Sequence, residues 1–123
     1  MAALKQNRNM LIGRWGEHEA ARFLVERGYS IVEINYRTPH GEIDLIATKE
    51  AQVIFFEVKA RTSVKFGYPE ASITSQKKQH MLSAVECYLE THVDMESWQY
   101  DVLAIRRQPT GFVEIVHFEN VLA

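Results

Sequence analysis

The chain has only one cysteine, Cys87, among its 123 residues. A single thiol excludes an intrachain disulfide framework and a zinc site built from several cysteines. No stretch approaches the ~20 apolar residues of a membrane span, and residues 1–8 lack the apolar run of a signal peptide. The sequence also has no internal repeat, linker or low-complexity tract. We therefore expect a single domain over residues 1–123, of which 1–8 need not be ordered, in a reducing cytoplasm.

Basic residues are missing from one part of the chain, because residues 86–101 contain five Asp and Glu but no Lys or Arg. The net charge of the whole chain is −2, which by itself argues against a polyanionic partner. Outside 86–101, however, 14 Lys and Arg stand against 11 Asp and Glu. The composition therefore leaves room for a locally basic surface that contacts nucleic acid.

The apolar and charged fractions, 46% and 24%, are those of an ordinary globular protein. Hydrophobic periodicity and turn residues predict an α/β chain in the order α-β-β-β-α-β-β. The expected helices are 9–27, which ends at Gly28, and 74–91, which Thr74 caps. The expected strands are 29–37, 42–48, 52–61, 98–106 and 112–118. We expect the second helix to bury a stripe made of Met81, Leu82, Val85, Tyr88 and Leu89.

One acid of the first helix, Glu17, falls on its apolar face. Gly13, Ala20 and Leu24 lie at i−4, i+3 and i+7 from it, so they share that face. A carboxylate among such neighbours must be paired, bound to metal or neutralised.

Two apolar strands end in carboxylates. On 42–48, alternation places Glu42 and Asp44 on one face and Ile43, Leu45 and Ala47 on the other. On 52–61, Glu57 and Lys59 share a face because they are two residues apart. The simpler interpretation is that strand ends are solvated and that Lys59 forms a surface salt bridge with a neighbouring acid.

Glu17 favours a different interpretation of Asp44 and Glu57. Three carboxylates that converge repel one another, and a bound cation offsets that cost most simply. Mg²⁺ or Mn²⁺ suits a site made of two or three carboxylates, and a bound metal activates water against a phosphate. Lys59 could then orient that water or help to deprotonate it.

At this point the residues resemble a known family. Asp44, thirteen positions before Glu57-Val58-Lys59, resembles the signature of the PD-(D/E)XK nuclease superfamily. Within it the chain resembles the small bacterial YraN-type family of predicted endonucleases, which are similar to archaeal Holliday-junction resolvases. The segments that carry this resemblance are Gly16-Glu17 with Ala20-Ala21, residues 41–47, residues 56–61 and Tyr100-Asp101-Val102. One position departs from the superfamily pattern, since Ile43 precedes Asp44 where a proline is typical.

The resemblance implies a restriction-endonuclease-like core, in which two helices flank a central mixed sheet. It implies that Asp44, Glu57 and Glu17 bind Mg²⁺ or Mn²⁺, with the Val58 carbonyl as a further ligand, and that Lys59 positions the water. Lys78 resembles a residue that supports the site in many members. The candidate phosphate contacts are Arg37, Arg61, Lys65, Lys77 and Lys78.

The leading hypothesis is an endonuclease on branched or otherwise structured DNA, which would act as a homodimer because it must cut two strands symmetrically. The alternatives are a non-catalytic DNA-binding or recombination-accessory module and a protein-interaction domain without a nucleic-acid role. His40 is either a phosphate contact or, more simply, a solvated loop residue. Asp101 either supports a basic residue or, more simply, is a surface acid at a strand start. Five apolar residues are dimer-interface or core candidates: Phe112, Val113, Ile115, Val116 and Phe118.

Overall fold

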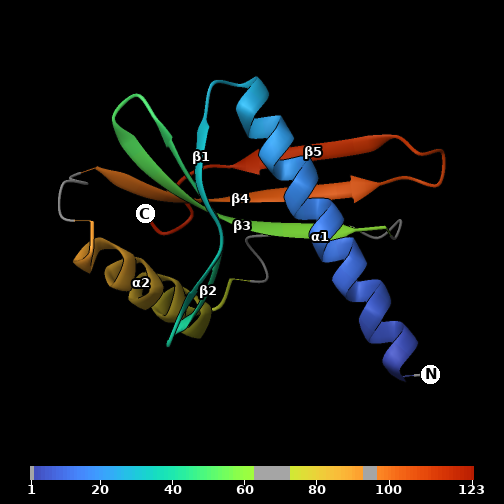
Figure 1. Cartoon of the computed structure of the whole chain (residues 1–123), viewed down its shortest axis with the longest axis horizontal. Helices are drawn as coiled ribbons and strands as arrows, with labels where there is room; N and C mark the ends of the chain where they lie inside the picture. Colours follow the sequence, from blue (N-terminus) through green and yellow to red (C-terminus); the bar gives the residue numbers. More distant parts are fainter. Residues whose placement is uncertain (1, 63–72, 93–96) are drawn as a thin grey trace.

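The structure is a computed structural model that describes residues 2–62, 73–92 and 97–123, with side chains from Met10 onward. Five strands form one mixed sheet in the spatial order β1-β2-β3-β4-β5, as Figure 1 shows. The first three strands pair antiparallel, β4 runs parallel to β3, and β5 returns antiparallel to β4. The strands are β1 (Ser30–Thr38), β2 (Gly41–Lys49), β3 (Gln52–Arg61), β4 (Trp98–Arg107) and β5 (Val113–Phe118).

Two helices complete the fold, α1 (Ala2–Glu26) and α2 (Ser75–Glu90). The parallel β3–β4 pair requires a crossover connection, and α2 lies in it. The order α-β-β-β-α-β-β and the α/β class are thus confirmed, with a mixed sheet between two helices. Neither helix, within the described residues, has the length and apolar character needed to cross a bilayer.

The start of α1 differs from the sequence-based expectation. The helix begins at Ala2 rather than at residue 9. Residues 2–8 contain strong helix formers and neither Gly nor Pro, so helix propensity carries the helix back to its start. The end was expected correctly. Gly28, at φ +90°, donates to the Val25 carbonyl while Tyr29 donates to the Leu24 carbonyl, which is the Schellman arrangement.

The two faces of the sheet have separate cores. Phe55 and its alternate neighbours pack with α2, whereas Phe56 and its alternate neighbours pack with α1. Thr74 caps α2 by accepting from the Lys77 backbone N–H, and the helix buries Met81, Ala84, Val85 and Tyr88. Leu82, expected in that stripe, is exposed, and Ala84 takes its place because the helix presents the 81–84–85–88 face to the sheet.

A glycine sets how closely α1 approaches β3. A Cβ built on Gly16 would lie 2.5 Å from the Ala60 Cβ, closer than real side-chain carbons come to one another. The helix can therefore cross the strand at this distance only because position 16 has no side chain. Since Glu17 is the next residue, the same close approach brings its carboxylate to the sheet.

Strands β2 and β3 pair only over part of their length. Their ladder ends at the pair Leu45–Phe56, while the β1–β2 ladder continues to Gly41. Strict alternation also fails at this point. Ile43 belongs to the core on the α2 side, whereas Leu45 and Ala47 belong to the core on the α1 side, so the expectation that all three share a face is wrong. The sheet therefore opens at Asp44, the residue between these two orientations.

Candidate metal centre

Asp44 lies at the point where β2 separates from β3. Its Oδ2 accepts a hydrogen bond from the backbone N–H of Val58 at 2.8 Å. The carboxylate thereby takes the position that a backbone carbonyl would hold in a continued ladder, which fixes the side chain against β3. The spacing between Asp44 and the Glu57-Val58 pair in the sequence therefore corresponds to a direct contact in the fold.

Three carboxylates converge at this opening, Glu17 from α1 and Glu42 and Asp44 from β2. One oxygen atom of each lies within 4.8 Å of the others. Asn35 holds Glu17, because its Nδ2 donates to Glu17 Oε2 at 3.0 Å. Asn35 has a φ of 56°, a left-handed conformation that asparagine adopts more readily than most residues. Sequence reasoning named Glu17 and Asp44, but it missed Glu42, although alternation already placed Glu42 beside Asp44, and it missed Asn35.

The surroundings of Asp44 favour its neutral form. The pKa of this carboxyl group is raised from 3.8 to about 7: burial raises it most, the charges of Glu57, Glu17 and Glu42 add to the rise, and the hydrogen bond from Val58 works in the opposite direction. Near neutral pH the group is therefore close to its titration point. A cation at this position would relieve both the desolvation and the repulsion.

Glu57 is turned toward α2. Its Oε1 lies 2.5 Å from the Lys77 Nζ, and its side chain is 15% exposed. Its other oxygen, Oε2, is buried and finds no hydrogen-bond partner among the residues that the structure describes. The sequence predicted that Glu17, Asp44 and Glu57 would converge. The structure instead joins Glu17 and Asp44 with Glu42, and it leaves Glu57 beside this group, near enough for its charge to act on Asp44.

A cavity of about 130 Å³ adjoins Glu57 on the α2 side of the sheet. It is lined among others by His40, from the turn before β2, and by Lys77 and His80, from the first turns of α2. Tyr100 closes it from β4. Burial, and then the charges of Asp44 and Glu57, raise the pKa of the Tyr100 hydroxyl. This hydroxyl thus lies in the field of both acids and stays protonated, so that it is available as a hydrogen-bond donor.

The other candidate site residues lie at different places. Lys59 is half-buried on β3, two residues beyond Glu57. Lys78 is exposed and lines a separate cavity of about 320 Å³ with residues 118–121, so it is Lys77, rather than the expected Lys78, that contacts Glu57. Lys65 falls outside the described residues.

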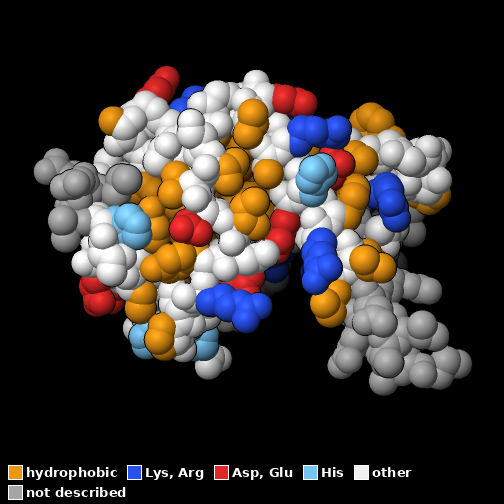
Figure 2. All heavy atoms as spheres, in the orientation of Figure 1, with side chains coloured by type: hydrophobic (Ala, Val, Ile, Leu, Met, Phe, Trp, Pro, Cys, Tyr) orange, Lys and Arg blue, Asp and Glu red, His pale blue; other side chains and the backbone are white. Residues whose placement is uncertain are grey.

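The two arginines expected to contact phosphate are both exposed. The Nε of Arg37 lies 3.9 Å from Glu42 Oε2. Arg61 donates from Nη1 to the Ala60 carbonyl at 2.9 Å. In Figure 2, acidic side chains lie at the inner end of the hollow at the lower centre of the molecule, and Lys or Arg side chains lie on both sides of it. Positive charge therefore borders the acids on this face, although the chain as a whole is acidic.

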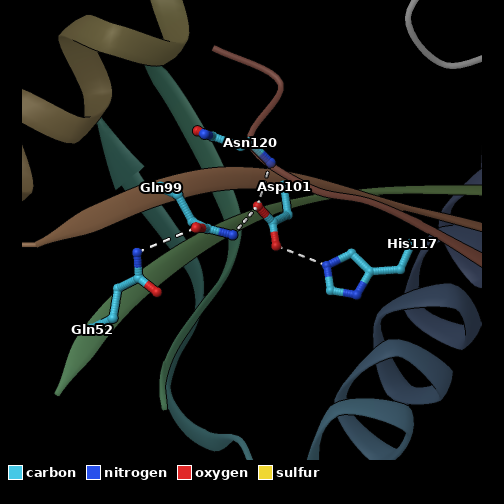
Figure 3. A network of polar contacts seen from close by, with 5 residues as sticks. All are labelled: Gln52, Gln99, Asp101, His117 and Asn120. Atoms are coloured by element: carbon cyan, nitrogen blue, oxygen red, sulfur yellow. Dashed lines mark hydrogen bonds and ion pairs between the residues drawn. The ribbon is translucent and has the colours of Figure 1, made fainter. Parts of the chain in front are cut away.

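A second polar cluster surrounds Asp101, as Figure 3 shows. The carboxylate is completely buried, and its Oδ1 accepts from Gln99 Nε2 at 2.9 Å and from the Asn120 backbone N–H at 2.8 Å. Its Oδ2 lies 2.7 Å from His117 Nε2. The interpretation of Asp101 as a surface acid is therefore wrong, because β4 lies inside the sheet between β3 and β5.

The two clusters differ in their suitability for a metal. Asp101, His117 and Glu119 also place ligand atoms within 4.8 Å of one another, but the Asp101 carboxylate already has three hydrogen-bond partners. The group around Asp44 has mostly acids for neighbours. Hard oxygen donors that repel one another are the ligands that Mg²⁺ and Mn²⁺ prefer, so the residues at the β2–β3 opening fit such an ion.

Fold and site together define a small α/β protein whose sheet opens around a cluster of acids able to hold a metal ion. A family model described as "Uncharacterised protein family UPF0102" matches residues 16–105, and the chain belongs to this family. The match confirms the resemblance to the YraN-type family.

Curated relatives agree with this family. A UPF0102 protein of Syntrophotalea carbinolica is 39% identical over 108 residues, which cover 87% of each chain. One of Syntrophus aciditrophicus is 37% identical over 87% of this chain and 85% of its own. One of Flavobacterium psychrophilum is 36% identical over 89% and 91% of the two chains.

Proposed function

We propose that this protein is a metal-dependent endonuclease that hydrolyses phosphodiester bonds in branched or otherwise structured DNA, in the cytoplasm. The observation that carries the proposal is the convergence of Glu17, Glu42 and Asp44, with Glu57 alongside, around a carboxyl group whose pKa is raised to about 7. Such a group is poorly accommodated without a cation. The resemblance of the Asp44 and Glu57-Val58-Lys59 pattern to nuclease signatures adds to this support.

Each residue has a role in this proposal. Bound Mg²⁺ or Mn²⁺ would lower the pKa of a coordinated water and neutralise charge on a phosphate oxygen. Glu17, Glu42, Asp44 and Glu57 supply carboxylate ligands, and the carbonyl of Val58, next to the N–H that Asp44 binds, is a further candidate ligand. Lys59 orients the attacking water from its place on β3.

DNA is the proposed substrate because positive charge borders the acids (Figure 2). Arg37 and Arg61 are exposed and available for phosphate contacts. If six to ten phosphates are contacted, DNA affinity falls by ~10³ or more between 50 and 200 mM salt. A fluorescence-anisotropy titration at these two salt concentrations measures that dependence.

Two strand cuts with symmetric geometry require two sites, so we also propose a homodimer. The edge strands offer surfaces for it. Val32 and Ile34 on β1 are 44% and 50% exposed, and Phe112 and Val116 at β5 are also exposed. Val113 and Ile115, which were interface or core candidates, pack against the core on the α1 side. If analytical ultracentrifugation finds only monomer at micromolar concentration, the proposed homodimer is contradicted.

The test of the function is a cleavage panel of duplex, single-stranded, flap and four-way-junction DNA with Mg²⁺ and with Mn²⁺. Asp44→Asn, purified in parallel, is the contamination control, because the amide keeps the shape and can still accept from Val58. We expect cleavage by the wild type alone. Equal cleavage by both proteins contradicts the mechanism. Binding of branched DNA without cleavage in any metal favours the alternative, a non-catalytic DNA-binding or recombination-accessory module.

A further inference from the structure

Glu57 has two alternative positive partners: the ammonium of Lys77 and the metal ion proposed above. Its Oε1 contacts the Lys77 Nζ, while its charge is the largest of the three carboxylate charges that raise the pKa of Asp44. The other oxygen, Oε2, has no such contact within the described residues, but an ammonium on Oε1 repels a divalent ion that either oxygen of the same carboxylate would hold. A metal shared by Asp44 and Glu57 must therefore compete with Lys77.

Lys77 has room to move. Its side chain is 42% exposed, and it lies in the first turn of α2, whose position Thr74 fixes by accepting from the Lys77 backbone N–H. A lysine carries its charge on a flexible stem and can change partners without moving the backbone. The side chain borders the cavity that His40 and His80 also line. An oxyanion in this cavity would meet one ammonium and two imidazoles, and also the carboxylates of Glu42 and Glu57, whose negative charge a bound metal would neutralise.

We propose that Lys77 is an internal competitor that a divalent cation displaces from Glu57, and that the displaced ammonium binds a phosphate of the substrate in the cavity lined by His40 and His80. This inference rests on the metal-dependent nuclease function proposed above. Metal binding frees the ammonium for the phosphate, and the phosphate keeps it away from Glu57. Metal and phosphate therefore bind cooperatively, and each raises the affinity for the other by the same factor.

The first experiment measures Mn²⁺ affinity by calorimetry and by electron paramagnetic resonance, on the whole chain and without DNA. Lys77→Met should bind Mn²⁺ about tenfold more tightly or better, because the ion no longer displaces an ammonium and meets the full charge of Glu57. Lys77→Arg keeps the competing charge and should stay within about threefold of the wild type. Lys78→Met removes the neighbouring lysine, which does not contact Glu57, and should leave the affinity unchanged.

The second experiment repeats the Mn²⁺ titration with sulfate, an oxyanion of the same shape as phosphate. Sulfate should tighten Mn²⁺ binding to the wild type and to Lys78→Met, but not to Lys77→Met. Any association of sulfate with free Mn²⁺ is common to all variants, so the difference between them is the readout.

The outcomes separate this inference from the function on which it rests. Equal Mn²⁺ affinity of wild type and Lys77→Met overturns the competition, even if the wild type cleaves DNA. A tighter Lys77→Met protein with an unchanged response to sulfate overturns the transfer of the ammonium to the anion. Failure of every variant to bind Mn²⁺ overturns this inference and the metal-dependent function together.

Discussion

Asp44 and Asp101 are carboxylates on strands of the same sheet, yet their neighbours have opposite character. Asp101 is completely buried and accepts from Gln99, Asn120 and His117. Asp44 has one backbone donor, and its pKa is raised by burial and then by the charges of three other acids. The saturated carboxylate has donors that favour its charged form, whereas the charged form of the crowded one costs stability, which either protonation or a bound cation can return. Burial alone therefore does not single out a candidate metal-binding acid; the charges of its neighbours do.

Removing each carboxylate in turn should show the largest difference between Asp44 and Asp101. Asp101→Ala leaves several buried donors without an acceptor and should lower the free energy of unfolding by about 3 to 5 kcal/mol. Asp44→Ala relieves repulsion and should leave that free energy unchanged or raise it. Urea unfolding followed by circular dichroism at pH 8, without divalent ions, measures both. Comparable losses in the two variants would mean that the carboxylates play the same part.

The pH dependence of the free energy of unfolding is the next test, because the raised pKa of Asp44 predicts a specific change. Since the pKa of Asp44 is raised from 3.8 to about 7, the folded state holds a proton that the unfolded chain releases near pH 4. The folded state then binds more protons over this interval, so the contribution of Asp44 to stability is greatest below pH 4, falls as pH rises to about 7, and is level above it. The expected fall is on the order of 4 kcal/mol.

Asp44→Asn is the control for this titration, because an amide has no proton to lose in the interval. The difference in unfolding free energy between wild type and Asp44→Asn should change across pH 4 to 7 and be constant above. A difference that stays flat from pH 4 to pH 8 would show that Asp44 is an ordinary surface acid.

A third variant tests the acidic cluster around Asp44 by shifting Glu17. In Gly16→Ala the new Cβ would meet the Ala60 Cβ at 2.5 Å, so α1 must shift away from β3. We expect a loss of about 2 kcal/mol and weaker Mn²⁺ binding, because Glu17 moves with the helix. The double variant with Ala60→Gly should recover both.

Gly13→Ala is the matched control for this change, since nothing lies within 4 Å of a Cβ built there. This variant should be more stable by about 0.5 to 1 kcal/mol, because alanine favours a helix interior over glycine. If Gly16→Ala behaves in the same way as Gly13→Ala, the close approach of α1 does not position Glu17.

The smallest expected effect comes from one donor of the saturated carboxylate. His117→Phe removes the contact to Asp101 Oδ2 but leaves the Gln99 and Asn120 donors in place. The loss should be about 1 kcal/mol, well below that of Asp101→Ala, because the carboxylate keeps its other partners. Thermal unfolding at pH 7 compares them. A loss as large as that of Asp101→Ala would make the His117 contact, rather than the whole network, responsible for stability.

The elements of the fold were largely predictable from the sequence, because alternation and caps are local signals. Gly28 ended α1 and Thr74 began α2 as expected. The start of α1 was missed, since no capping residue marks it and propensity alone extends it to Ala2. Leu82 was wrongly placed in the buried stripe because the sequence does not show which side of α2 faces the sheet.

The candidate site was predictable in its parts but not in its geometry. The spacing of Asp44 and Glu57 indicated that the two residues belong to one site. In the structure their strands are joined by the hydrogen bond from the Val58 backbone N–H to Asp44. The opening of the sheet was not visible, because strict alternation assumes a continuous ladder. The choice between Lys77 and Lys78 depends on the rotation of α2, and the burial of Asp101 depends on which strands flank β4. These are tertiary features that no local pattern encodes.

The most direct test of the central claim is the stability of the wild type and of Asp44→Asn at pH 8 as Mn²⁺ is added. If the acids at the β2–β3 opening hold the ion, the wild type should gain about 2.7 kcal/mol at a Mn²⁺ concentration one hundred times the Kd, and Asp44→Asn should gain little at the same concentration. Parallel gains in the two proteins, or no gain in either, would contradict the account.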